Sequence, residues 1–117
     1  MPTKLAFRTP VGGVVVPLPP ETHLGTVNVA NFERIRVYCG LPRFGLSTQA
    51  MFVSLYIKEG DDLLILDVYQ LADVLVVRQV YEVPGRELEI RAVTYYEEYR
   101  GSPPVIGPLE VFVWGYE

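Results

Sequence analysis

The chain has little of what builds a metal centre, a disulfide framework or a catalytic dyad. Its 117 residues include one cysteine, Cys39, and one histidine, His23. A single cysteine excludes an internal disulfide and zinc sites of the multi-cysteine kind, and we expect Cys39 to be a buried apolar residue on a strand. A histidine base needs a nucleophile and an orienting group nearby. His23 has no such partner in a motif, so we expect it to be exposed in a loop.

Long apolar runs and helical periodicity are also missing. No stretch approaches the length of a membrane span, and residues 1–8 lack the apolar segment of a secretion signal. We therefore expect synthesis in the cytoplasm without a signal peptide, and no membrane partner. The formal charge of −4 argues against a nucleic-acid partner, because phosphate binding needs a clustered basic surface. The sequence contains neither a glycine-rich phosphate loop nor a recognisable catalytic signature, so we expect no cofactor and no enzymatic activity.

The residues that are present predict one all-β domain. Half of the chain is apolar and 21% is charged, which excludes disorder. Residues 1–24 read as an extended arm or edge strand, since residues 9–20 hold four of the ten prolines. Residues 25–117 read as the sandwich core. The arm carries four apolar side chains that could cover a sheet face, namely Val14, Val15, Val16 and Leu18.

Short β-branched and aromatic runs follow the arm at the spacing of a sandwich. They predict strands over residues 25–29, 33–39, 74–83, 87–96 and 109–116, and a hairpin over residues 50–70. Seven or eight strands without helices indicate a two-sheet antiparallel β-sandwich of jelly-roll-like type. Within residues 33–39 the alternation directs three residues inward, Ile35, Val37 and Cys39.

The dipeptide Pro84-Gly85 predicts a crossing between the two sheets. Proline followed by glycine suits a type II turn, whose twist fits a tight hairpin poorly. A hairpin here would also place Glu82 opposite Glu87, and facing like charges are destabilising.

The hairpin at residues 50–70 is apolar on both faces. With a turn at Gly60-Asp61, one face pairs Ile57 with Leu64, Leu55 with Leu66 and Val53 with Val68; the other pairs Lys58 with Leu63, Tyr56 with Ile65, Ser54 with Asp67 and Phe52 with Tyr69. A sheet with one solvated face should alternate apolar and polar residues. We therefore expect the second face to be covered, either by the N-terminal arm or by another subunit. We predict a protein interface at Phe52, Tyr56, Ile65 and Tyr69.

Two further groups of residues are candidates for ligand binding. Glu59, Asp61 and Asp62 surround a glycine and could hold calcium, although tight turns favour the same residues for conformational reasons. Aromatic residues that could stack on a sugar, with an arginine to bind hydroxyl groups, are Tyr95, Tyr96, Tyr99, Trp114 and Arg100.

Three segments, residues 27–38, 81–90 and 111–116, together resemble strands and turns of galactose-binding-like β-sandwiches, the discoidin and carbohydrate-module type. The resemblance covers residues 25–117. It implies a largely non-catalytic family that binds glycans, lipids or proteins through loops at one end of the sandwich, often with a structural calcium. Small jelly-roll subunits of virions look similar at this level.

These observations predict a non-catalytic structural or interaction protein. We expect it to form a homo-oligomer or to join a larger assembly, such as a phage or virus particle, through its surplus apolar surface. The alternative is a carbohydrate-binding module that recognises a glycan.

Overall fold

The structure, a computed structural model, shows eight β-strands and no helix in the residues that it describes. Those residues are 3–16, 20–40, 49–71, 76–82, 87–96 and 108–116, with the backbone alone at residues 49, 50, 95 and 96. The strands are β1 (Thr3–Arg8), β2 (Thr22–Asn28), β3 (Arg34–Gly40), β4 (Gln49–Glu59), β5 (Asp62–Leu71), β6 (Val76–Glu82), β7 (Glu87–Tyr96) and β8 (Glu110–Tyr116).

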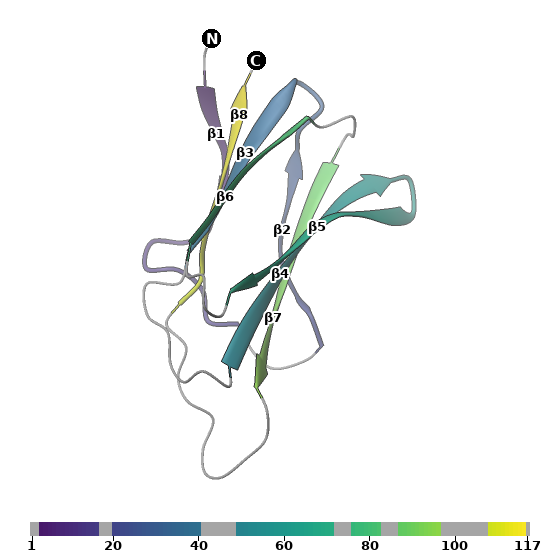
Figure 1. The fold of residues 1–117 in the computed structure, drawn as a ribbon. Coiled ribbons are helices and arrows are strands. Elements are labelled where there is room, and N and C mark those ends of the chain that lie inside the picture. Colours follow the sequence, from purple (N-terminus) through teal and green to yellow (C-terminus); the bar gives the residue numbers. More distant parts are fainter. Residues whose placement is uncertain are drawn as a thin grey trace.

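The strands form two antiparallel four-stranded sheets that face each other (Figure 1). The first sheet has the order β1-β8-β3-β6, and the second has the order β2-β7-β4-β5. Two four-stranded sheets with these strand orders, joined by crossings everywhere except at the β4–β5 hairpin, make a jelly roll. The predicted all-β sandwich is confirmed.

The core lies between the two sheets and consists of the inward residues of each strand. Ile35, Val37 and Cys39 of β3 are fully buried, as their alternation predicted. They face inward residues of the second sheet such as Leu55 and Ile90, which are buried to the same degree. Burial of each such aliphatic side chain stabilises the fold by roughly 1.5–3 kcal/mol.

The chain crosses between the sheets between β6 and β7, as predicted from Pro84-Gly85. Strand β6 pairs with β3 in the first sheet, whereas β7 pairs with β2 and β4 in the second. Glu82 lies opposite Arg34 and Glu87 lies opposite Lys58, so neither glutamate faces the other. The two turn residues themselves fall outside the described residues.

The β4–β5 hairpin follows the predicted register only near its tip. Gly60 has a φ of +60°, which the first central residue of a type II′ turn requires. The pairs Ile57–Leu64, Lys58–Leu63 and Tyr56–Ile65 form as predicted. Leu66 is then an extra residue, a β-bulge, and the partners beyond it shift by one: Leu55–Asp67, Ser54–Val68, Val53–Tyr69 and Phe52–Gln70.

The bulge reverses the predicted faces of the second half of β5. A shift of one residue moves each side chain to the opposite face of a strand. Tyr69, which we predicted at the outer interface, points into the core and is 6% exposed. Val68 takes the outer position and is exposed. The prediction for Tyr69 was therefore wrong, because period-two counting cannot detect an inserted residue.

The N-terminal arm reaches the outer face of the hairpin at Glu21, whose carboxylate accepts a hydrogen bond from the Tyr56 hydroxyl. Its apolar residues Val14 and Val16 lie elsewhere. After β1, Val14 forms a bridge with Leu109 next to the first sheet. Val16 is buried, and its carbonyl accepts a 2.6 Å hydrogen bond from the Thr94 hydroxyl of the second sheet. The arm therefore spans the end of the core from one sheet to the other. Leu18 lies outside the described residues.

The Phe32 ring packs against Gly115 of β8 and lies where a Cβ atom at that position would be. This contact can be tested by substitution. Alanine normally suits a strand better than glycine. We nevertheless expect Gly115→Ala to lower the free energy of unfolding by about 1–3 kcal/mol, through overpacking. Urea denaturation would measure this, and adding Phe32→Leu should restore part of the loss. An unchanged or higher stability for Gly115→Ala would contradict the packing.

Candidate functional site

Strand β5, an edge strand of the second sheet, carries most of the exposed apolar surface of the predicted interface. Ile65 is 66% exposed and lies opposite Tyr56 on the outer face. Phe52 and Tyr56 are half-buried on the same face. Val68 is exposed on this face too, and Leu64 is exposed on the other face of β5, opposite Ile57. Three of the four predicted interface residues therefore share a face, and Tyr69 does not.

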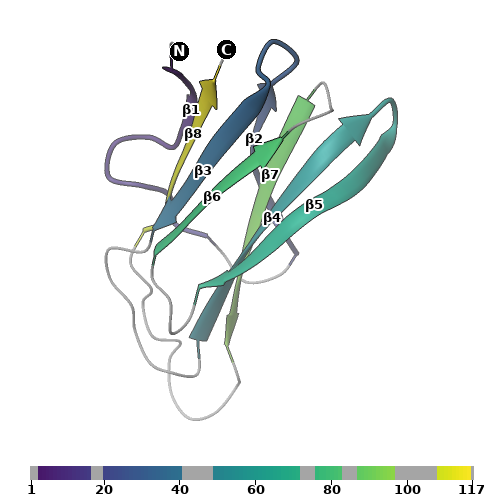
Figure 2. The ribbon, with the colours of Figure 1, turned by 45° about the horizontal axis from the view of Figure 1, so that its top comes forward.

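The edge of the first sheet runs along the same side of the molecule. Figure 2 shows β5 and β6 next to each other as the outermost strands of their sheets. Val76 and Val80 of β6 are exposed. Edge strands present unpaired backbone groups, which makes them sites for pairing with another chain.

A tyrosine pair links the two edges from inside. The Tyr81 hydroxyl of β6 donates a 2.7 Å hydrogen bond to Asp67 Oδ2 of β5 and is also hydrogen-bonded to the Tyr69 hydroxyl. Burial is the main cause that raises the pKa of both phenols. The hydrogen bond with Tyr81 raises the pKa of Tyr69 further, whereas for Tyr81 the bond with Tyr69 lowers the pKa and the bond to Asp67 raises it. Both rings therefore stay neutral well into the alkaline range. The bulge at Leu66 creates this link, because it brings Asp67 and Tyr69 to the inner side.

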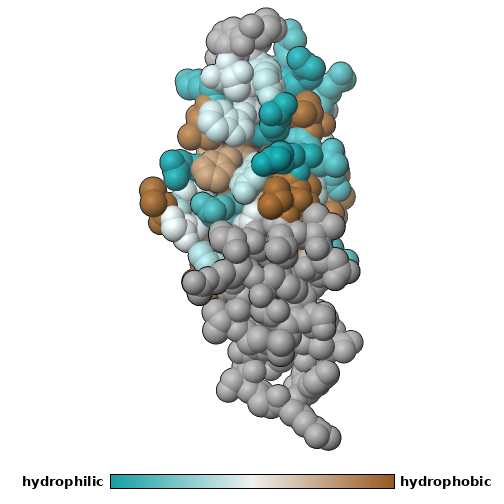
Figure 3. All heavy atoms as spheres, turned by 60° about the vertical axis from the view of Figure 1, so that its left-hand side comes forward, coloured by the Kyte–Doolittle hydropathy of each residue, from teal (hydrophilic) through white to brown (hydrophobic). Residues whose placement is uncertain are grey.

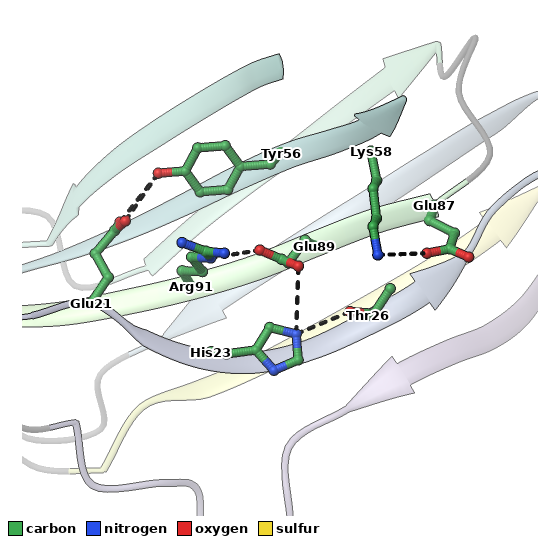
Figure 4. A network of polar contacts seen from close by, with 8 residues as sticks. All are labelled: Glu21, His23, Thr26, Tyr56, Lys58, Glu87, Glu89 and Arg91. Carbon is green, nitrogen blue, oxygen red and sulfur yellow. Dashed lines mark hydrogen bonds and ion pairs between the residues drawn. The ribbon is translucent and has the colours of Figure 1, made fainter. Parts of the chain in front are cut away.

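The middle of the outer face of the second sheet is polar, which the hairpin sequence did not indicate. Glu89 of β7 is only 7% exposed, and its Oε2 accepts a 2.5 Å hydrogen bond from Arg91 Nε (Figure 4). The Arg91 guanidinium stacks over the Tyr56 ring at 5.5 Å from its centroid. The Tyr56 hydroxyl in turn donates to Glu21 Oε1 at 3.1 Å. This network fixes the Tyr56 ring against the sheet.

His23 belongs to this network and lies in strand β2, so the prediction of a loop position was wrong, although its side chain is exposed. Its Nε2 is 3.0 Å from Thr26 Oγ1 and 3.9 Å from Glu89 Oε1. In a catalytic triad, the acid and the nucleophile contact opposite ring nitrogens of the histidine. Here both approach the same nitrogen, so the imidazole cannot pass a proton from one to the other.

The residues predicted for sugar binding are not brought together in the part that the structure describes. Trp114 lies on the outer face of β8 in the first sheet, 37% exposed, whereas Tyr95 and Tyr96 end strand β7 of the second sheet. The side chains of Tyr95 and Tyr96, together with Tyr99 and Arg100, lie outside the described residues. Trp114 instead lines a shallow hollow of about 390 Å³ with Arg36, Tyr38, Arg78 and Phe112.

The calcium candidates form a turn. Glu59 pairs with Asp62 beside Gly60, and Asp61 is exposed at the tip of the hairpin. Across the described ranges, no three histidine, cysteine or acidic residues are grouped to hold a metal ion. The alternative reading of this segment, a tight turn, is the one that the structure bears out.

Sequence reasoning missed the contribution of Glu89, Arg91 and the outer residues of the first sheet. Arg34 and Arg36 share a face with each other, as do Phe112, Trp114 and Tyr116, and this much is readable from period-two spacing. That β3 lies beside β8 is a matter of strand order, which no local pattern contains. The two sets therefore could not be joined from sequence.

Comparisons with protein-family models, curated proteins and solved structures found no match. The resemblance to galactose-binding-like sandwiches stays a prediction. In the residues that the structure describes, no helix is long and apolar enough to cross a membrane.

Replacing Arg91 tests the outer network. We expect Arg91→Ala to lower the free energy of unfolding by about 1–3 kcal/mol, because the buried Glu89 carboxylate loses its hydrogen-bond donor. Lys58→Ala is the matched control, since its 4.0 Å pair with Glu87 is much more exposed than the Arg91–Glu89 pair and should contribute less than about 1 kcal/mol. Chemical denaturation of both variants measures the difference, and equal effects would count against a structural role for the network.

Cys39 predicts an alkaline loss of stability. Burial raises the pKa of its thiol from 9.0 to about 12, so between these values the unfolded chain releases a proton that the folded chain keeps. Stability is therefore intact below pH 9 and falls as the pH rises. By pH 10.5 this group alone should cost about 2 kcal/mol. Denaturation at pH 8 and pH 10.5 should show a smaller fall for Cys39→Ala than for the wild type, and equal falls would refute this assignment.

Proposed function

We propose that this chain is a non-catalytic β-sandwich subunit that self-associates or joins a larger assembly through strand β5. The observation that carries the proposal is the exposure of Ile65 and Val68 on the outer face of a ten-residue edge strand, with Leu64 exposed on its other face. Neighbouring exposed apolar residues are uncommon on a monomer surface unless they serve an interaction.

The chemistry of β5 favours a second copy of the chain as the partner. Between residues 63 and 71 the only charged residue is Asp67, and its side chain faces inward to Tyr81. Lysine, proline and outward charge, which protect edge strands against pairing, are thus missing from this stretch; the bulge at Leu66 and the inward-facing Asp67 are the protective features there. Antiparallel pairing of two β5 strands would satisfy their backbone groups and cover Ile65 and Val68.

The fold suggests the setting. Jelly rolls serve both as viral capsid subunits and as lectins, and fold alone does not decide between them. The exposed edge favours the structural role, with a phage or virus particle as one such assembly. A carbohydrate-binding role is the alternative, and Trp114, on the outer face of the first sheet, would supply a stacking surface for it.

Size measurement at tens of micromolar tests the proposal. We expect light scattering coupled to size-exclusion chromatography to show a dimer or larger species for the wild type. The double substitution Ile65→Lys and Val68→Lys should yield a folded monomer, because two charges would have to be buried at the interface. Val11→Lys, at a loop position that is 88% exposed, is the control and should leave the species unchanged. A wild-type monomer at these concentrations would end the proposal.

A further inference from the structure

The outer face of the first sheet gathers four of the eight arginines of a chain whose formal charge is −4. Arg8 comes from β1, Arg34 and Arg36 from β3, and Arg78 from β6. Each pairs across the sheet with an outward residue of the neighbouring strand. Net charge therefore conceals a local basic surface.

The register arranges these arginines among aromatic rings in three rows that run across β1, β8, β3 and β6. The rows are Arg8, Phe112, Tyr38 and Arg78; Leu5, Trp114, Arg36 and Val80; and Thr3, Tyr116, Arg34 and Glu82. Successive rows are two residues apart along β8, β3 and β6, or roughly 7 Å; in β1 a bulge between Leu5 and Phe7 makes one of these steps three residues. Every row contains at least one ring and one guanidinium.

Contacts within the face hold the guanidinium groups close to the rings. Arg8 lies 5.3 Å from the centroid of Phe112, and Arg78 lies 5.5 Å from that of Tyr38. Arg34 and Arg36 lie 5.7 and 6.0 Å from the Tyr116 centroid. Cation–π contacts of this kind orient an arginine without using its N–H donors.

The donors of these arginines are not neutralised by carboxylates in the described part of the chain. The three ion pairs found there involve His23, Lys58 and Arg91, all on the second sheet. Arg8 makes one bond to a carbonyl, that of Thr9 at 3.3 Å. The hollow bounded by Arg36, Tyr38, Arg78, Phe112 and Trp114 lies in the middle of this face. Figure 3 brings that side of the molecule forward and shows hydrophilic side chains interleaved with apolar ones.

We propose that this face binds single-stranded nucleic acid, with bases stacked on Trp114 and Phe112 and phosphates held by Arg8, Arg36 and Arg78. A single strand offers planar rings and anionic groups in regular alternation, which matches rows that each combine a ring with a cation. A duplex keeps its bases covered, and an acidic peptide has no planar groups to stack. The expectation of no nucleic-acid partner rested on net charge, which takes no account of how the charges are distributed.

Fluorescence anisotropy with a labelled oligothymidylate of about twelve nucleotides tests the proposal. We expect binding that weakens between about 50 and 200 mM salt with a log–log slope near −2, since about three phosphates would be neutralised. Trp114→Ala should weaken binding roughly 5- to 100-fold through loss of stacking. The double variant Arg36→Ala and Arg78→Ala should reduce the magnitude of the slope by about 1.4.

Lys58→Ala, which removes a cation from the other sheet, is the matched control and should leave binding unchanged. Thermal unfolding of each variant confirms that it is folded. The Ile65→Lys and Val68→Lys variant should still bind the oligonucleotide, which separates this proposal from the one on self-association. Two results would overturn it. One is no binding at tens of micromolar protein in low salt. The other is that heparin or polyglutamate binds as tightly as the oligonucleotide and that Trp114→Ala weakens the binding of neither.

Discussion

The alternation of side chains between the two faces of a strand decides which residues of this protein are buried and which are exposed. Strand β5 breaks the alternation once. Before Leu66, Ile65 faces outward as counting predicts; beyond it, Tyr69 faces inward against the count. That single inserted residue places Asp67 and Tyr69 within reach of Tyr81 and so connects the open edges of both sheets. The same insertion leaves Val68 in solvent. One irregularity thereby determines both an internal polar link and an external apolar surface.

Much of the fold could be read from the sequence because its signals are local. Residues 33–39 alternate, Gly60-Asp61 marks a turn, and Pro84-Gly85 opposes a hairpin; each was sufficient to predict the corresponding element. The sites could not be predicted as well, because they depend on strand order. Glu89 and His23 meet only because β2 lies beside β7, and the arginines of β3 reach Trp114 and Tyr116 only because β8 separates β3 from β1. No pattern within a strand encodes its neighbours.

The two outer faces differ in how their charges are used. On the second sheet, cations are paired with carboxylates: Arg91 with Glu89, and Lys58 with Glu87. On the first sheet, the arginines lie against aromatic rings instead. A cation that is already bonded to a carboxylate has few N–H donors left for a ligand, whereas a guanidinium stacked on a ring keeps its donors available. What distinguishes a face that stabilises the fold from one suited to a ligand is therefore which groups its cations contact, more than how many cations it has.

The order of strands also governs when the molecule can fold. In each sheet a late strand lies between early ones: β8 separates β1 from β3, and β7 separates β2 from β4. While a ribosome synthesises the chain, the early strands of a sheet therefore cannot yet pair, because the strand that lies between them has not been made. Pairing of such distant segments is slow, since a long loop must close first. Folding of this jelly roll should accordingly wait until its last strand has emerged, and the nascent chain would expose its β5 edge throughout that interval.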